Sequence, residues 1–438
     1  MGHRMSEITG TRAAAASILR SVSRGQRLDL AFQRAVSGMS SRDRRFVQEI
    51  TYGTVRLRGR LDHLLDQHLR KGLESVSTEV LNLLRLGAYQ LLCLDGVPDY
   101  AAVSQTVDQV REVAGKGASR MANGILRNLD REGAGLERFP DFRREPESHL
   151  SSWGSHPSWL IRRWLRRWSP DEVRTLVEFN NTPPPLFFRP LESGPAAAAG
   201  MLVQLGFEVT EMEEGIPCLN LGFGTDPARV LAELKGLIQD PGAALVTVYG
   251  DMASRSPVGD LCAAPGGKTL ALAGEGAYVL AGDRSLRRLQ LLRENVERVG
   301  GRIDMVAALA QAPPFRSLPG LLLDVPCSGT GTLRRHPDAR WRITEALLEH
   351  LAAVQREMLE AGSRIVDQGG VLVYSTCSLE PEENEDQVTW FLKANPEFVL
   401  ENSGTVGGRF LDEAGCLSVF PQTSGFDGAF AARLVRRA

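Results

Sequence analysis

The chain has 438 residues, of which 43% are hydrophobic and 24% are charged. This is the composition of a globular protein, and it excludes a chain that is mostly disordered or collagen-like. The apolar runs fall far short of the ~20 residues that a membrane-spanning helix needs, and the N-terminus lacks the pattern of a secretory signal. We therefore expect a cytoplasmic protein without a membrane partner.

Charge is distributed unevenly along the chain. Residues 1–168 hold 27 Lys and Arg against 18 Asp and Glu, a balance of +9, whereas residues 169–438 hold 24 against 35, a balance of −11. A basic part joined to an acidic part predicts a nucleic-acid-binding module attached to a region with another task. The alternative is chance variation on solvated surfaces.

The first part of the chain has the periodicity of amphipathic helices. Apolar residues recur at three- and four-residue spacing in segments 11–22, 77–94, 103–114 and 117–129. Ser77 offers an N-cap oxygen to the second segment, and Gly115 and Gly117 separate the last two. Strand-like alternation is absent, so we predict an all-α bundle over residues 1–140.

Residues 141–182 are expected to form a linker and a helix rich in Trp and Arg. Four of the six tryptophans and four arginines fall within residues 153–168. Trp164 and Trp168 are four residues apart, which predicts that they share one helix face. Such residues can stack bases and pair phosphates, but we favour tryptophans that pack this helix against the following domain, with the arginines in water or on nucleic acid.

The remaining chain changes to alternating strands and helices. Residues 183–256 predict a small α/β subdomain. Residues 257–438 follow the βα repeat of a Rossmann-like α/β fold with a doubly wound, mostly parallel sheet, in which ligands bind at the carboxyl ends of the strands. The predicted strands are 258–263, 278–283, 303–308, 320–325, 370–375 and 429–436.

The first strand of this sheet is predicted to run into a glycine-rich turn. The turn consists of Cys262, Ala263, Ala264, Pro265, Gly266, Gly267 and Lys268. Two glycines let the backbone approach a ligand closely, and the following helix presents its free N–H groups there. The turn is neither a GxGxxG fingerprint nor a P-loop. Asp283 ends the next strand, where an acid typically binds ribose hydroxyls, so the two features predict an adenosine-type cofactor.

Two cysteines follow neighbouring strands of the predicted sheet. Cys327 comes three residues after Asp324, at the end of the fourth strand, and Cys377 comes just past the fifth. The carboxyl ends of adjacent parallel strands share one edge, so we expect both thiols over one crevice beside the glycine-rich turn. A single cysteine is usually a buried hydrophobe, but this pair beside an acid predicts catalysis. The six cysteines form no CxxC pair, so we expect neither a metal site nor a disulfide framework.

Three segments resemble the signature blocks of S-adenosylmethionine-dependent RNA cytosine-C5 methyltransferases. They are DLCAAPGGKT (260–269), DVPCSGTGTLRRHPDARW (324–341) and YSTCSLEPEENE (374–385). The helical part resembles a NusB-type RNA-binding domain. Together they are similar to bacterial 16S rRNA methyltransferases of the RsmB/Fmu type over nearly the whole chain. The resemblance implies S-adenosylmethionine as cofactor, 16S rRNA as partner, cytosine 967 as the usual target and a monomeric enzyme.

The resemblance also implies a covalent mechanism, in which a thiolate adds to C6 and makes C5 able to accept a methyl group. By the family pattern Cys377 is the nucleophile and Cys327 assists its release. Spacing alone does not assign these roles, because related DNA enzymes use the cysteine of a Pro-Cys motif. Asp324 is implied to bind the N3/N4 edge of cytosine and to border the cofactor; its alternative role is to cap the loop after the strand.

Two positions depart from the family pattern. Leu309 stands where an acid usually contacts the adenine amino group, and losing that hydrogen bond costs ~0.5–1.5 kcal/mol of cofactor affinity. Residues 189–191 read Arg-Pro-Leu in place of Arg-Val-Asn, which affects a substrate contact. Leu309 favours the alternative of a non-catalytic RNA-binding or ribosome-assembly factor. The intact cysteines and glycine-rich turn favour the enzyme. A DNA methyltransferase is a third interpretation, which the basic helical part disfavours.

Overall fold

The computed structural model describes residues 8–222 and 224–437. The expectation that the N-terminus lacks a secretory signal concerns, in part, residues 1–7, which lie outside these described residues. The chain divides into two compact units. One comprises the described residues up to Pro183 together with Leu333–Arg342, and the other comprises Pro184–Thr332 and the residues from Ile343 onward. Within the described ranges, no helix has the length and apolar character that a membrane span requires.

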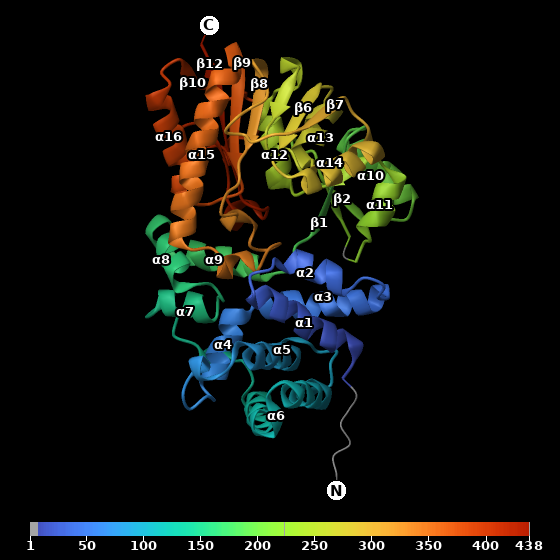
Figure 1. Ribbon diagram of the computed structural model, residues 1–438, viewed down its shortest axis with the longest axis vertical. Coiled ribbons are helices and arrows are strands. Elements are labelled where there is room, and N and C mark those ends of the chain that lie inside the picture. The colour runs from blue at the N-terminus through green and yellow to red at the C-terminus, as the bar shows by residue number, and fades with distance from the viewer. Residues whose placement is uncertain (1–7, 223, 438) are drawn as a thin grey trace. The chain divides into compact units, whose positions relative to one another are not determined.

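The first unit is helical, as predicted. Its elements are α1 (Gly10–Ser23), α2 (Leu28–Ala35), α3 (Ser41–Arg56), α4 (Arg58–Asp66), η1 (Leu73–Ser75), α5 (Thr78–Cys93), α6 (Asp99–Glu132), η2 (Leu136–Arg138), α7 (Pro146–Ser152), α8 (Ser158–Arg167), α9 (Pro170–Asn181) and η5 (Ala339–Trp341). Helices α5 and α6 lie side by side (Figure 1). Ser77 caps α5 through a hydrogen bond from Val80 N (3.5 Å). Gly115, with φ of 79°, kinks α6 where we expected a break between two helices.

The prediction that Trp164 and Trp168 share a helix face is wrong. Helix α8 ends at Arg167, and Trp168 has extended backbone angles. The reason lies in the next residues: Ser169 and Glu172 form a capping box that starts α9, so the chain must leave the helix one residue earlier. Trp164 is 2% exposed, and its ring contacts His156 within the same unit.

A short segment from the second half of the block 324–341 belongs to the first unit. In this segment, Leu333–Arg342, the Arg340 guanidinium is fully buried and donates hydrogen bonds to the backbone oxygens of Ser155 and Asn180 (both 3.0 Å). Trp341 Nε1 donates to Val55 O (2.9 Å). The family-like block 324–341 therefore contributes to both units.

The second unit contains the predicted doubly wound sheet. Its strands lie in the order β10-β12-β9-β8-β5-β6-β7, with β11 paired to β12. Strands β5 to β9 pair in parallel, and β12 runs antiparallel to β9. All six predicted strands are confirmed; β10 and β11 were not predicted. The elements are β5 (Val258–Asp260), β6 (Val279–Asp283), β7 (Ile303–Ala307), β8 (Leu318–Asp324), β9 (Val366–Thr376), β10 (Phe398–Leu400), β11 (Leu417–Val419), β12 (Ala429–Arg436), α12 (Pro241–Gly250), α13 (Gly267–Gly274), α14 (Leu286–Val299), α15 (Glu345–Ile365), α16 (Glu385–Ala394), α17 (Pro421–Ser424), η3 (Ala253–Arg255), η4 (Thr330–Thr332), η6 (Pro381–Glu383) and η7 (Gly408–Phe410).

Alternating side chains of β9 bury both faces of this sheet. Val371 and Val373 pack with Tyr249 of α12, whereas Leu372 and Tyr374 pack on the opposite face with residues of α15 and α16. Figure 1 shows α15 and α16 on one side of the sheet and α12, α13 and α14 on the other. Because both faces are covered, the strands read as continuous apolar runs.

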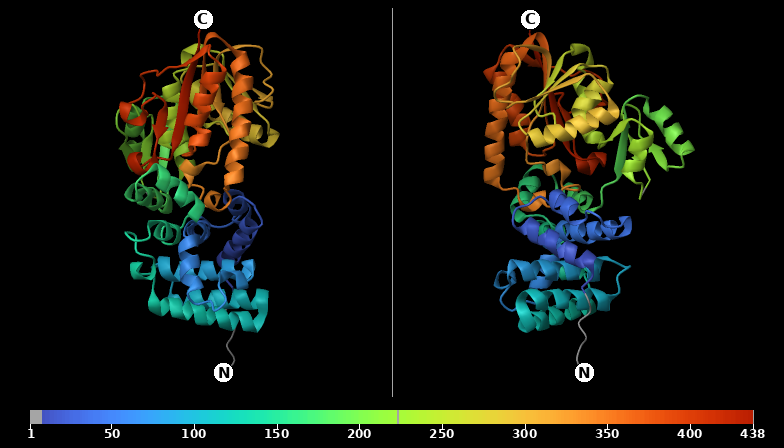
Figure 2. Two further views of the ribbon diagram at one scale, coloured as in Figure 1. Left: turned by 90° about the vertical axis from the view of Figure 1, so that its left-hand side faces the viewer. Right: turned by 45° about the vertical axis from the view of Figure 1, so that its right-hand side comes forward.

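A smaller antiparallel sheet precedes the large one in the same unit. It comprises β1 (Leu186–Pro190), β2 (Val209–Glu211), β3 (Leu219–Leu221) and β4 (Gly236–Ile238) in the order β2-β3-β1-β4, with α10 (Pro195–Gln204) and α11 (Pro227–Glu233). The green and yellow-green ribbon of Figure 2 traces this part. Its core includes Phe188, Leu202 and Leu219. Helix α12 packs against strand β12 of the large sheet and against helix α13. The predicted division of the chain into four domains, at residues 140, 182 and 256, stays a prediction.

Candidate active site

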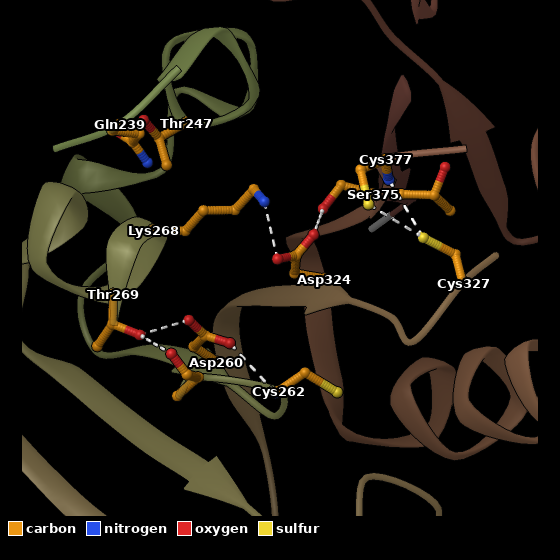
Figure 3. A network of polar contacts seen from close by, with 12 residues as sticks. Gln239, Thr247, Asp260, Cys262, Lys268, Thr269, Asp324, Cys327, Ser375 and Cys377 are labelled. Atoms are coloured by element: carbon orange, nitrogen blue, oxygen red, sulfur yellow. Dashed lines mark hydrogen bonds and ion pairs between the residues drawn. The ribbon is translucent and has the colours of Figure 1, made fainter. Parts of the chain in front are cut away.

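The glycine-rich turn is folded back onto the end of β5 by a buried acid. Asp260 is 1% exposed and accepts hydrogen bonds from Thr269 Oγ1 (2.6 Å) and Cys262 N (3.2 Å) (Figure 3). Burial raises the pKa of Asp260 to about 7. Gly266 has a φ of +113°, and a Cβ there would lie 2.5 Å from Leu292 Cδ1, so the turn requires glycine at this position.

Helix α13 (Gly267–Gly274) begins within this turn and offers backbone donors. Gly266 is its N-cap and, among the described residues, no side chain caps the helix. The N–H groups of its first turn are therefore open to a ligand. A Cβ added at Gly267 would meet only Gln239 Nε2 at 3.4 Å, so the space above the turn is not filled by the protein's own backbone.

Asp283 lies at the end of β6, beside the turn. It is 2% exposed and accepts hydrogen bonds from Ala264 N (3.3 Å) and Ser285 N (2.9 Å). Arg288 forms an ion pair with it (3.3 Å). The carboxylate thus stabilises the glycine-rich turn, and Oδ1, which accepts from Ser285 N, keeps a second lone pair for a ligand hydroxyl. Its contact with a ribose stays a prediction.

Asp324 at the end of β8 joins the turn to the neighbouring strand. It accepts hydrogen bonds from Lys268 Nζ (2.7 Å) and Ser375 Oγ (2.8 Å). Burial lowers the pKa of Lys268, but the charge of Asp324 and its hydrogen bond outweigh burial, so this pKa is raised overall. Sequence reasoning placed Lys268 only at the cofactor and missed Ser375. The missing signal was strand register, which sets Asp324 opposite Ser375.

The structure brings Cys327 and Cys377 together. Figure 3 shows their side chains pointing toward one another from separate segments, with the sulfur atoms 3.4 Å apart. Cys377 N also donates a hydrogen bond to Cys327 Sγ (3.4 Å), and Gly331 N donates to Cys377 O (2.9 Å). Both cysteine residues are partly exposed. The two cysteines therefore form one chemical unit at the edge of the sheet.

The two thiols have opposite pKa shifts. The pKa of Cys377 is lowered, chiefly because the Cys327 thiol donates a hydrogen bond to its sulfur; burial and the charges of Asp324 and Glu383 oppose this, and Lys268 supports it. The pKa of Cys327 is raised by the same hydrogen bond and by burial. These directions favour thiolate character at Cys377 over Cys327, and the roles of the two cysteines in a reaction stay a prediction.

Three further residues named from the sequence lie outside this pair. Cys262 is partly exposed, and burial raises the pKa of its thiol. Leu309 is 54% exposed after β7. Arg189 is 3% exposed and donates to Gln239 Oε1 (3.1 Å) and to Glu275 (2.8 Å), so its guanidinium ties the small sheet to α13.

Known proteins match the chain along nearly its full length. Residues 252–435 match the family described as 16S rRNA methyltransferase RsmB/F, residues 156–222 the RsmF/B-like ferredoxin-like domain and residues 9–131 the NusB family. The probable ribosomal RNA small subunit methyltransferase B of Synechocystis is 35% identical over 97% of this chain and 98% of that protein. That of Sodalis glossinidius is 31% identical over 97% and 96%. The crystal structure of PH0851 shares the fold (TM-score 0.74, 24% identity, 98% of this chain and 100% of that one).

The doubly wound sheet and its polar edge are those of a methyltransferase domain, here preceded by a NusB-like helical region. Relatives above 30% identity cover almost the entire chain. The chain therefore belongs to the RsmB/F family of 16S rRNA methyltransferases.

Proposed function

We propose that the protein transfers a methyl group from S-adenosylmethionine to C5 of a cytosine in 16S rRNA, at cytosine 967, through a covalent bond between Cys377 and C6. One observation carries this proposal. Two thiols with opposite pKa shifts lie 3.4 Å apart, next to the Lys268–Asp324 ion pair. The names of the relatives, which are small-subunit rRNA methyltransferases, support the choice of RNA.

The residues around the glycine-rich turn fit S-adenosylmethionine. The open N–H groups of α13 suit its carboxylate, and the spare lone pair of Asp283 Oδ1 suits a ribose hydroxyl. Turn residues 262–268, Asp283 and Asp324 would hold it. When bound, it supplies a methyl group on a positively charged sulfur. Leu309 leaves the adenine amino group without the acid that other family members offer.

The protein's part in the first step is to add a nucleophile. The Cys377 thiolate forms a bond to C6, and the electron pair of the C5–C6 double bond moves to C5, which becomes able to take the methyl group. Asp324 accepts a hydrogen bond from the cytosine amino group and orients the ring. Its side chain is 31% exposed, which leaves access for this third partner beside Lys268 and Ser375.

The second step must release the enzyme. A solvent water accepts the C5 proton, the bonding pair of that proton forms the C5–C6 double bond, and the C6–S pair returns to Cys377. The Cys327 thiol, 3.4 Å away, donates a hydrogen bond to the departing thiolate and stabilises it. The two cysteines therefore serve different steps of one reaction.

We further propose that the monomeric protein binds the RNA through its helical part. The +9 balance of residues 1–168 and the NusB match support this. Replacing the exposed Arg42 and Arg45 of α3 by glutamine should reduce the slope of RNA affinity against salt by about 1 for each lost phosphate contact. Replacing the exposed Arg293 of α14 is the control.

Mapping of 5-methylcytosine in small-subunit rRNA tests the proposed reaction. Cells lacking the gene should lose one modified cytosine, the wild-type gene should restore it and the Cys377→Ala gene should not. If the cells without the gene keep every modified cytosine, the result would instead support a non-catalytic assembly factor. The exposed Leu309, which replaces an acid, favours that alternative.

A further inference from the structure

A buried acid outside the proposed reaction lies behind the two cysteines. Glu383 ends η6 and is completely buried. Its carboxylate accepts hydrogen bonds from Ser328 N (2.8 Å), Ser328 Oγ (2.5 Å) and Gln355 Nε2 (3.0 Å). A buried carboxylate is costly unless its oxygens are satisfied by donors. These donors are neutral, so Glu383 interacts with them through hydrogen bonds rather than through an ion pair.

The partners of Glu383 belong to the two loops that carry the cysteines. Ser328 follows Cys327 directly, and its Oγ lies 3.1 Å from the Oγ of Ser378, which follows Cys377. Gln355 also donates to the carbonyl oxygen just before Cys327 (3.0 Å). The Glu383 carboxylate thus holds the first loop on both sides of Cys327 and, through the two serines, the second loop.

The backbone of Glu383 is fixed in turn by the sheet. Its carbonyl accepts a hydrogen bond from the hydroxyl of Tyr374 (2.6 Å), a fully buried residue of β9. The oxygen of the same hydroxyl lies 3.2 Å from Gln355 Oε1. Strand β9 therefore fixes the backbone of Glu383, and packed side chains set the distance of its carboxylate from Ser328 and Ser378.

We infer that Glu383 is a positioning residue that holds the two cysteine loops together, so that the Cys327 thiol stays at hydrogen-bond distance from Cys377. The inference rests on the proposed function, because it concerns the positions of the two cysteines that the proposed reaction uses. It assigns Glu383 no contact with RNA or with the methyl donor.

Two effects of Glu383 on Cys377 have opposite signs and can be separated. Its negative charge disfavours the thiolate and raises the pKa of Cys377, but this is a minor influence beside the hydrogen bond from Cys327, which lowers that pKa. Deleting the side chain removes both effects, so the pKa of Cys377 should rise. Glu383→Gln removes the charge but keeps an oxygen and an amide of the same shape, so the pKa should fall.

The test is the pH profile of Cys377 alkylation by iodoacetamide in the full-length protein, without RNA or methyl donor, read for each cysteine by mass spectrometry. Glu383→Ala should slow alkylation at pH 7 by about tenfold, which corresponds to one pH unit in the profile. Glu383→Gln should move the profile to lower pH. Glu357→Gln, an exposed change on α15, is the matched control, and the exposed Cys93 is the internal reference.

The outcomes separate this inference from the proposed reaction. A folded Glu383→Ala protein with the wild-type profile overturns it, as do profiles of both variants that move in the same direction. If circular dichroism shows that Glu383→Ala does not fold, Glu383→Gln decides, and a wild-type profile there overturns it. Since no RNA is present, failure of the covalent mechanism would leave these results unchanged.

Discussion

Replacing Asp260 by asparagine tests whether a buried acid supports the glycine-rich turn in its uncharged form. Burial raises the pKa of Asp260 to about 7, whereas an aspartate in an unfolded chain titrates near about 3.9. Between these values the folded protein holds a proton that the unfolded chain has lost. Stability from this group is therefore fully present below the unfolded pKa and is lost as pH rises through the folded pKa.

The magnitude follows from the same two pKa values. Between pH 5 and pH 7 each pH unit costs about 1.4 kcal/mol, so this group alone removes about 3 kcal/mol of unfolding free energy between pH 5 and pH 8.5. Asp260→Asn cannot ionise and keeps hydrogen-bonding atoms for Cys262 and Thr269, so the variant should lack this loss.

Pulse proteolysis in urea at about pH 5 and pH 8.5 measures the unfolding free energy of Asp260→Asn and wild type. Mass spectrometry counts the peptides of the second unit. Glu413→Gln removes one exposed charge from the same unit and should behave as wild type. The reasoning is refuted if the stability difference between Asp260→Asn and wild type changes by less than about 0.5 kcal/mol over this range, which is the scatter of surface substitutions.

Three further predictions concern four substitutions. Arg340→Met should destabilise the first unit by about 3 kcal/mol or more, measured by urea unfolding, because several buried backbone oxygens lose their donor; a loss below 1 kcal/mol would show that these bonds are dispensable. Gly266→Ala should lower the melting temperature of the second unit, whereas Gly267→Ala should leave it unchanged but weaken S-adenosylmethionine binding by calorimetry, since only the former position has positive φ and a blocked Cβ; equal melting shifts would contradict this. Lys268→Met should move Cys377 alkylation to higher pH, since the ammonium group lowers the pKa of that thiol; an unmoved profile would show that its charge is not felt there.

The large sheet was predictable because its physical signals are local. The apolar run over Val371–Tyr374 reads as a strand since both of its faces are buried, and glycines and acids mark the strand ends. The proximity of Cys327 and Cys377 followed from strand adjacency. Ser375 was missed because register decides which side chain lies opposite Asp324, and register is set by packing across the sheet.

Other features depend on long-range partners that the sequence does not reveal. Arg340 lies in a block that reads as one motif, yet its buried site is built by backbone oxygens at Arg56, Ser155 and Asn180. Glu383 lies in a run of acids within the block 374–385, and only the packed Gln355 and the serine loops show that it is buried.

The central claim is that Cys377 attacks and Cys327 assists release, and one measurement tests it most directly. Wild type, Cys327→Ala and Cys377→Ala are each incubated with 16S rRNA and S-adenosylmethionine and then separated on a denaturing gel. Cys327→Ala should accumulate a protein–RNA conjugate, because the adduct forms but elimination is slow, whereas Cys377→Ala should form none. A conjugate that accumulates with Cys377→Ala and not with Cys327→Ala would contradict the account and exchange the two roles.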